Sequence, residues 1–495
     1  LKERDPQALG SVLGLDRTPE VKTLRRKLSR LASYHKAERL GAELARFRIE
    51  QRGRAMGFLY VDGHVRVYYG KRSIPKTHVA RMRLSMPATT DYWINDQLGD
   101  PLFVVTASAN AGMVKMLPQL LAQVRELVGD RRVTIVFDRG GWSPALFQRL
   151  LEANFDILTY RKGKGRRIAA HRFSLRSACF EGHTVEYQLH DQPVRFLKGK
   201  LRLRQVTRLG DDDHQTCVIT SRWDLPDIEV AYRMFERWRQ ENFFKYLREE
   251  FLLDALVDYQ LEPDDPTRLI PNPERRSLDK EVLKARSEVA RLEQAYGAAA
   301  ADNPEGRRPT MRGFKIAHGD IGRQLREART RLAQLREQRR ALPQRVEIRQ
   351  VGDDAVIKLA TERKHLTNLI KMLAYQAESD LLTLLRPHYA RSDDEGRTLL
   401  HELFANRGDI EAINSELRVT VRPMSSPHRT AAVRTLCEIL TDTCTCFPGS
   451  SLVMRFAVSA SPKPCMAFPG PRQAPPRAPA SQGSGRLQPD ILRKG

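Results

Sequence analysis

Cysteine is scarce in this sequence, with six residues among 495. Cys179, Cys217 and Cys437 each stand alone within an apolar run, whereas Cys444 and Cys446 form a C-x-C pair. No further histidine or cysteine pair lies at the spacing of a zinc finger. We therefore expect these cysteines to be reduced thiols without a special role, as is usual in the reducing environment of a cytoplasm.

Long apolar stretches are also missing. No window reaches 18 consecutive apolar residues, so we expect no membrane-spanning segment. The start of the chain is charged and lacks the apolar stretch of a signal peptide, so we expect no signal peptide. Residue 1 is leucine rather than methionine, which is compatible with a fragment of a longer protein.

Acidic residues are outnumbered. The chain has 84 Lys and Arg residues against 60 Asp and Glu residues, which gives a net charge of +24. Such a surplus indicates a polyanionic partner, usually nucleic acid, with an anionic membrane surface as the alternative. Hydrophobic residues make up 41% of the chain, which is enough for a sizeable core. The length favours roughly two to four domains.

The N-terminal region, residues 1–56, is basic and its pattern is helical. Thr18-Pro19-Glu20 has the residue types of a helix start, and one long helix is expected to follow it. Basic residues gather in the first half of this helix, either as a solvated face or as a contact to DNA phosphates. These residues are Arg25, Arg26, Lys27 and Arg30.

Residues 57–160 alternate between strand and helix patterns, which is typical of an α/β sheet. Residues 57–72 predict a strand, a turn at Asp62-Gly63 and a second strand. The remaining predicted elements are helices at 113–130 and 143–156 and strands at 131–138 and 155–160.

Residues 161–222 alternate apolar and polar side chains and predict a β-rich, antiparallel insertion. Turns are expected at Asp191-Gln192-Pro193 and at Gly210-Asp211. Within the next region, residues 223–262, a helix is predicted at 230–259.

Two heptad patterns within residues 278–342 predict an antiparallel helical hairpin. The hairpin could hold two protomers together, or it could simply support the core of its own chain. Residues 343–457 predict a helical C-terminal region, notably over 362–389. Residues 458–495 are rich in Pro, Ala, Ser and Gly and predict a disordered tail.

Three acids are candidate metal ligands. Asp62 ends the apolar run FLYV, Asp138 ends the apolar run VTIVF, and Glu241 lies on the later helix. A lone buried carboxylate is costly, and two at neighbouring strand ends repel each other unless a cation bridges them. Mg²⁺ suits such oxygen ligands. An aspartate after a strand is also a common turn former, and other acids could serve instead. These are Asp91, Asp96 and Asp156.

Three sequence blocks resemble the DDE transposases of bacterial insertion sequences, in the branch with a β insertion between the second Asp and the Glu. The blocks are VDGHVRVYYGKR, VFDRGGWS and RWRQENFFKY, and the resemblance extends over residues 12–457. The family marks the third block with Tyr, two residues, Arg, three residues, Glu, six residues and Lys. Arg237 and Glu241 match this pattern, Arg248 replaces the lysine, and Met234 departs from the tyrosine, although Tyr232 lies nearby.

The resemblance implies an RNase H-like core, formed by residues 57–160 and 223–262 and interrupted by the insertion. It implies that Asp62, Asp138 and Glu241 bind two Mg²⁺ ions, for which Mn²⁺ can substitute, and perform two-metal phosphoryl transfer. The expected activity is metal-dependent cleavage at transposon ends and strand transfer into target DNA. The expected setting is a homodimer on paired double-stranded DNA ends, at the nucleoid in bacterial cytoplasm. The alternatives are an RNase H-like nuclease that never joins strands and a decayed transposase that only binds DNA.

Basic residues near these blocks are predicted to contact DNA phosphates, which would give salt-dependent affinity. For Arg237 the alternative is an ion pair with Glu241, and for the strand lysines it is protection of an exposed sheet edge. The predicted contacts are Arg237, Arg239, Lys245 and Arg248 on the helix; Lys162, Lys164, Arg166 and Arg167 in a loop; and Lys198, Lys200, Arg202 and Arg204 along a strand.

Overall fold

The computed structural model describes residues 5–51, 57–72, 74–107, 111–163, 165–256, 259–302, 318–351 and 357–460. The chain divides into two compact units. The first comprises Leu1–Pro6 and Thr18–Ser379, and the second comprises Gln7–Arg17 and Asp380–Gly495. No helix in the described ranges is both long enough and apolar enough to cross a membrane.

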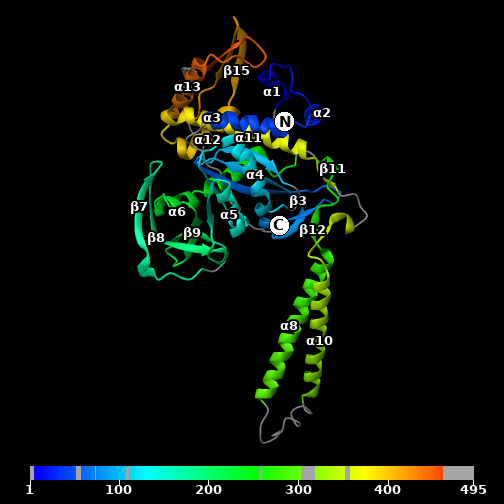
Figure 1. The fold of residues 1–495 in the computed structure, drawn as a ribbon. Helices are drawn as coiled ribbons and strands as arrows, with labels where there is room; N and C mark the ends of the chain where they lie inside the picture. The colour runs from blue at the N-terminus through cyan, green and yellow to red at the C-terminus, as the bar shows by residue number, and fades with distance from the viewer. Residues whose placement is uncertain are drawn as a thin grey trace, which may run out of the picture. The chain divides into compact units, whose positions relative to one another are not determined.

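A large mixed sheet forms the centre of the first unit (Figure 1). Its strands follow the order β2-β3-β1-β5-β6-β10-β9-β8-β7, and β4 pairs with β3. Strands β5 and β6 run parallel to β1, whereas β2, β3 and β4 form antiparallel pairs. The bounds of this first group are β1 Phe58–Val67, β2 Lys76–Val79, β3 Leu84–Asn95, β4 Pro101–Thr106, β5 Val133–Phe137 and β6 Phe155–Tyr160.

The first four residues of strand β1 are buried on both faces of the sheet because they form an uninterrupted apolar run. Leu59 and Val61 join the core beneath helices α3 (Ala37–Gln51), α4 (Met113–Val128) and α5 (Pro144–Glu152). Phe58 and Tyr60 point to the opposite face and pack with α6 (Asp227–Phe235). Such continuous apolar runs are typical of strands covered by helices on both sides. Each buried large side chain contributes about 1.5–3 kcal/mol relative to its exposure.

Residues 161–222 contain antiparallel strands, and these strands continue the central sheet because β10 pairs with β6. The predicted turn at Asp191-Gln192-Pro193 is wrong, since β8 runs through it. Asp191 instead pairs with Arg204 on the neighbouring strand. The strands are β7 Ser174–Phe180, β8 His183–Phe196, β9 Leu201–Leu209 and β10 Gln215–Thr220.

The predicted turn at Asp62-Gly63 is also wrong. Strand β1 continues to Val67, and Asp62 and Gly63 lie opposite Trp93 and Tyr92 of β3. The glycine serves packing here, because a Cβ atom at position 63 would lie 2.9 Å from Cε1 of Tyr92. A missing side chain therefore marks a close cross-strand contact rather than a change of direction.

Gly63→Ala is expected to destabilise the protein by roughly 1–3 kcal/mol, because the added methyl group must displace the Tyr92 ring within a packed core. Urea denaturation would measure the loss. Gly297→Ala is the matched control, since a Cβ atom there meets nothing within 4 Å and helix interiors favour alanine. Equal stability of the Gly63→Ala variant and the wild type would contradict this account.

Two predicted long helices are each divided in the structure. The N-terminal helix is α2 (Val21–Ala32) followed by α3, with His35 at a positive φ of 50° between them. The helix predicted at 230–259 is α6 followed by α7 (Trp238–Phe251). Arg237 lies in this second break, and Glu241 lies in the first turn of α7.

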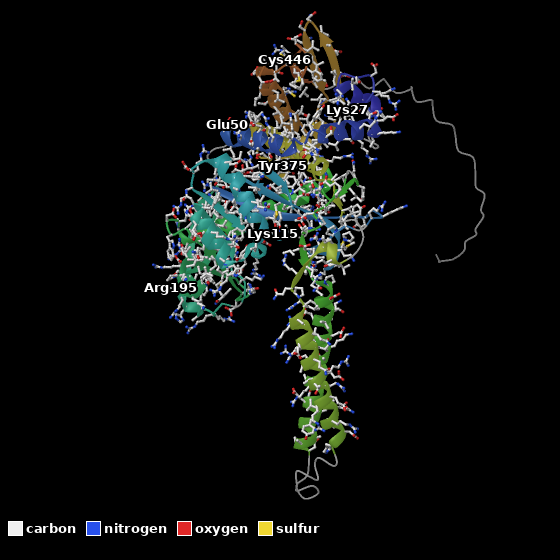
Figure 2. All side chains as sticks on the ribbon, turned by 45° about the vertical axis from the view of Figure 1, so that its right-hand side comes forward. Lys27, Glu50, Lys115, Arg195, Tyr375 and Cys446 are labelled. Atoms are coloured by element: carbon white, nitrogen blue, oxygen red, sulfur yellow. The ribbon has the colours of Figure 1, made fainter. Side chains whose placement is uncertain are left out.

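Helices α8 (Pro273–Ala301) and α10 (Gly319–Ala341) lie side by side (Figure 1). Apolar residues at heptad positions, including Val289 and Leu332, form the seam between them. An ion pair of 2.7 Å joins Arg329 to Glu293, and Arg339 pairs with Asp279, so the helices run in opposite directions. Charged side chains line their outer faces (Figure 2). Two short strand pairs flank them: β11 (Leu261–Pro263) with β14 (Ile357–Leu359), and β12 (Leu269–Pro271) with β13 (Arg345–Glu347).

The C-terminal region is not purely helical, contrary to prediction. The second unit contains a three-stranded sheet in which β15 pairs antiparallel and β17 pairs parallel with β16. Helix α13 packs against this sheet through residues such as Val433 and Leu436. The predicted tail lies outside the described residues from 461 onward, and Val458 ends β17. The remaining bounds are α1 Pro6–Val12, α11 Thr361–Leu385, α12 Ser392–Ala405, β15 Gly408–Ile413, β16 Glu416–Val421, α13 Pro427–Asp442 and β17 Val453–Val458.

Candidate functional site

Asp62 and Asp138 lie at the same level of the central sheet. Strands β1 and β5 are parallel neighbours whose register pairs Val61 with Phe137, and each aspartate directly follows its member of that pair. Asp138 also caps a short 3-10 turn, because its Oδ1 accepts a 2.8 Å hydrogen bond from the Gly140 amide. The chain therefore brings two carboxylates separated by 76 positions to adjacent strands, by counting from 62 to 138.

Glu241 is placed by helix α7, which is anchored to the sheet through the preceding residue. The buried side-chain amide of Gln240 donates hydrogen bonds to the carbonyl of Tyr60 at 3.1 Å and to Oδ1 of Asn95 at 3.0 Å. Glu241 lies in the first turn of α7, where the helix dipole favours a negative charge. Its side chain is 67% exposed and is therefore free to change rotamer.

Arg237 links the helix acid to the strand acid. Its Nη1 lies 3.5 Å from Oδ2 of Asp62, and its Nη2 lies 3.5 Å from Oε1 of Glu241. The ion pair between Arg237 and Glu241, left open by the sequence, is thus present as a long contact. One guanidinium reaches both carboxylates, so Asp62 and Glu241 belong to the same site.

The electrostatics unite all three acids. Burial raises the pKa of Asp62 to about 6, and the charges of Asp138 and Glu241 act in the same direction, whereas Arg237 opposes them. The pKa of Tyr92 rises to about 12, first because of burial and then because Asp138 and Asp62 are negative. The site therefore concentrates negative charge and would gain free energy from a bound cation.

The carboxylates do not enclose a metal position in this conformation. No three His, Cys, Asp or Glu side chains in the described part of the chain lie close enough together to hold one ion. The donor chemistry nevertheless fits a hard divalent cation, because three carboxylates interact and the most buried of them has a raised pKa. Closing the site would require Glu241 to turn inward and Arg237 to move away.

The other candidate acids are occupied within the fold. Asp91 pairs with Arg66 and Lys364 in the interior. Asp96 accepts hydrogen bonds from the amides of Leu98 and Asp100 at 2.9 and 3.0 Å. Asp156 accepts a hydrogen bond of 2.7 Å from the Ser221 hydroxyl, and its second oxygen binds Arg132. These contacts explain the three acids as structural groups.

The predicted DNA contacts fall into two groups. Lys245 and Arg248 are exposed on α7, four and seven residues after Glu241, so they share its face of the helix. Arg239 is instead engaged inside the protein by Glu181 and Glu236, and Arg204 is buried against Asp191. Both arginines are of the residue type that contacts DNA, but their ion pairs with acidic side chains of the same chain give them a structural role.

The loop and strand residues are mostly exposed. Arg167 forms an ion pair with Asp213, and the Arg202 guanidinium lies 5.0 Å from the centroid of the Trp223 ring. Lys164 lies outside the described residues. The exposed basic residues are Lys162, Arg166, Arg167, Lys198, Lys200 and Arg202.

Three residues of the site were missed by sequence reasoning. Tyr92 interacts electrostatically with Asp138 and Asp62, Tyr160 interacts electrostatically with Arg237 and Glu241, and Gln240 anchors the helix. Only Gln240 carried a signal, as an uncharged polar residue directly before the helix acid. Met234, which departs from the family tyrosine, is fully buried in the core.

Comparison with known proteins identifies the family. A family model described as "Transposase protein" matches residues 3–460. The chain belongs to this transposase family. No curated protein gives a significant match to the transposase. Among solved structures, the transposase is similar to a piggyBac transposase in a synaptic complex with hairpin DNA. The identity is 12% and the TM-score 0.28, and the match covers 39% of this chain and 40% of that chain.

The raised pKa of Asp62 predicts a pH-dependent stability for the metal-free transposase. The pKa is about 6 in the folded protein and 3.8 in the unfolded chain, so the folded state binds more protons between these values. The resulting stabilisation is complete below the unfolded pKa and is lost as pH rises through the folded pKa. At neutral pH, Asp62→Asn should therefore stabilise the metal-free protein by about 3 kcal/mol.

Urea denaturation in the presence of a chelator would measure this effect. The advantage of Asp62→Asn should disappear below pH 3.8, where the wild-type carboxyl is protonated in both states. Asp130→Asn, at an exposed position after α4, serves as the control and should show no such pH dependence. A variant that is no more stable than the wild type at neutral pH would contradict the prediction.

Proposed function

We propose that this transposase is a DDE-type DNA transposase of the bacterial insertion-sequence branch. It would cut DNA at transposon ends and join those ends to target DNA, using Asp62, Asp138 and Glu241 as ligands of two Mg²⁺ ions. The observation that carries the proposal is the convergence of the three acids. Parallel pairing of β1 with β5 aligns Asp62 with Asp138, and Arg237 contacts both Asp62 and Glu241.

The topology supports an RNase H-like core. Strands β4, β3 and β1 are antiparallel neighbours, β5 and β6 follow in parallel, and α4 and α5 connect the parallel strands. Strands β7 to β10 come between Asp138 and Glu241 in the chain, which supports the proposed β insertion. In this arrangement the acids lie on the central strands and on the helix that covers them.

The residues of the site have complementary roles in this proposal. Bound Mg²⁺ would supply Lewis-acid activation of a water or a 3′-hydroxyl and would stabilise charge on the phosphate. Asp62 and Asp138 would contribute oxygen ligands from rigid strands, and Glu241 would contribute its ligand by a change of rotamer. Arg237 neutralises the acids in the metal-free protein and would be released to contact a DNA phosphate.

The exposed basic residues would then hold the DNA backbone beside the site. Lys245 and Arg248 follow Glu241 along α7. A DNA backbone with one phosphate at the site would therefore continue past these two residues. Contacts of this kind give affinity that falls with salt and carry no sequence information. Joining two transposon ends requires two active sites near each other, and we therefore propose a homodimer on paired ends.

Cleavage mapping would test the proposal. The full chain would be incubated with Mg²⁺ or Mn²⁺ and with duplexes taken from both sides of its own coding sequence, and nicks would be read at base resolution. We expect nicks at the ends of an inverted repeat. Joining of a donor with a free 3′-hydroxyl would distinguish a transposase from a nuclease that only cuts.

A second function is favoured by one observation, namely that the three acids do not enclose a metal position. A decayed copy would bind DNA with salt-dependent affinity and would give no nicks with either metal. That combination of results would overturn the proposed cleavage and leave DNA binding as the function.

A further inference from the structure

The turn between β7 and β8 contains a residue that is unfavourable for its backbone conformation. Phe180 pairs with His183, so Glu181 and Gly182 form a two-residue turn, and their φ angles are 52° and 83°. Turns with two positive φ angles favour Asn-Gly, because most side chains strain such a backbone. A glutamate at the first position is a local cost that its side-chain contacts can offset.

The side chain of Glu181 makes contacts that no other residue of the turn could replace. Its Oε2 lies 2.7 Å from Nη1 of Arg239, and its Oε1 lies 3.3 Å from Nη1 of Arg233. Arg239 additionally binds the carboxylate of Glu236 and donates a 3.3 Å hydrogen bond to the carbonyl of Gln97. Glu181 thus joins the turn to the end of α6 and to the start of α7.

An aromatic contact reinforces this attachment. The ring of Phe180, which precedes the turn, stacks on Tyr232 of α6 with centroids 4.4 Å apart and planes at 15°. The Tyr232 hydroxyl accepts a 3.3 Å hydrogen bond from Nη2 of Arg239. The turn therefore contacts both helices on either side of their break.

The attached segment is the one that positions the helix acid. Arg237 lies in the break between α6 and α7, and Glu241 lies four residues later, with Arg239 midway between them. The α6 side is fixed where the Tyr60 hydroxyl donates a 2.9 Å hydrogen bond to the Arg233 carbonyl. The orientation of the first turn of α7 then depends on Gln240 from within the core and on Arg239 from outside it.

We propose that the β7–β8 turn is a clamp that sets the position of Arg237 and Glu241, with Glu181 and Arg239 as its positioning residues. The consequence for DNA cleavage rests on the proposed function, whereas the clamp itself is a property of the fold. It gives the strands between Asp138 and Glu241 a specific task, which is to hold the segment that carries the third acid against the sheet. It also assigns Arg239 to the interior of the protein rather than to DNA.

Glu181→Asn tests the clamp because it separates the contacts of the side chain from the stability of the turn. The variant restores the favoured Asn-Gly turn and removes the carboxylate that binds Arg239. Hydrogen exchange should become about tenfold faster for the amides of Gln240–Leu247, while the melting temperature stays equal or rises. Half-maximal DNA nicking should require about tenfold more Mn²⁺, as expected when the support of a ligand is lost.

Two further variants complete the experiment. Glu186→Asn removes a carboxylate from an exposed position on the same β hairpin and should leave both measurements unchanged. Arg239→Gln should have at least the effects of Glu181→Asn, because it also removes the contacts to Glu236 and Gln97. The double variant should add little to Arg239→Gln alone, because the two residues share the contact that the clamp requires.

The outcomes separate the clamp from the proposed function. Unchanged exchange in α7 of the Glu181→Asn variant would overturn the clamp, as would an unchanged Mn²⁺ requirement in an enzyme that cleaves DNA. If the wild type gives no nicks, the proposed function fails, and the exchange measurement still decides the clamp.

Discussion

Asp138→Asn should abolish Mg²⁺-dependent cleavage and leave DNA binding nearly intact. The asparagine keeps an oxygen that can accept a hydrogen bond from the Gly140 amide, so the turn after β5 should retain its shape. What disappears is one negative charge beside Asp62, and with it a ligand for the proposed cations. A fall of at least about a thousandfold is expected, which corresponds to roughly 4 kcal/mol of transition-state stabilisation.

Cleavage and binding must be measured on the same preparation. Nicking of end-containing duplexes would report activity, and a filter or fluorescence assay would report affinity over a range of salt concentrations. Asp130→Asn removes the same charge from an exposed position a few residues before β5 and should cleave like the wild type. Undiminished cleavage by Asp138→Asn would remove this residue from the site.

Asp91→Asn should destabilise the first unit by about 3–5 kcal/mol, the range expected when one member of a buried ion pair is removed. Asp91 and Arg66 each have 1% of their side-chain surface exposed, and Nζ of Lys364 lies 3.2 Å from the second oxygen of Asp91. These cations hold the pKa of Asp91 well below its usual range. Without the carboxylate, the positive groups of Arg66 and Lys364 would face each other in the interior.

Chemical denaturation of both proteins would measure this loss. Glu43→Gln is the control, because it removes one carboxylate from an ion pair with Arg46 whose side chains are both about half exposed. Such surface pairs contribute less than about 1 kcal/mol. If Asp91→Asn costs no more than Glu43→Gln, the buried network does not stabilise the fold, and Asp91 would again be a candidate for chemistry.

Local signals made the secondary structure around Asp138 predictable. The apolar run before Asp138 forms β5, Ser143 caps α5 by accepting a hydrogen bond from the Leu146 amide, and Pro144 begins that helix. Each of these features depends on residues within a few positions of one another. The strand that precedes Asp138 and the helix that follows it could therefore be assigned from sequence alone.

Features that depend on distant partners could not be assigned in this way. Gly63 indicates a turn by its residue type, but its actual constraint is the ring of Tyr92 on the neighbouring strand. Arg239 and Lys245 are alike as basic residues on one helix. Only the fold shows that Arg239 forms an ion pair with Glu181, which lies 58 positions earlier in the chain. This ion pair engages the arginine within the protein rather than with DNA.

The helix breaks were unpredictable for a similar reason. Neither Pro nor Gly marks the junctions at residues 33–36 and 236–237. At the second junction, contacts from β1, β6 and the β7–β8 turn determine where α6 ends. The family resemblance predicts that Asp62, Asp138 and Glu241 act together, and the structure shows that Arg237 lies 3.5 Å from both Asp62 and Glu241.

The two strand pairs at the base of α8 and α10 affect how the length of these helices can change in evolution. Pro263 lies opposite Ile357, and Pro271 lies opposite Arg345, so the outgoing and returning chains are joined at both levels. The helical hairpin formed by α8 and α10 therefore begins and ends at neighbouring points of the paired strands. Equal numbers of heptads could therefore be inserted into or deleted from both helices without altering the spacing of the chain ends. The length of the helical hairpin can thus evolve separately from the chemistry of the site.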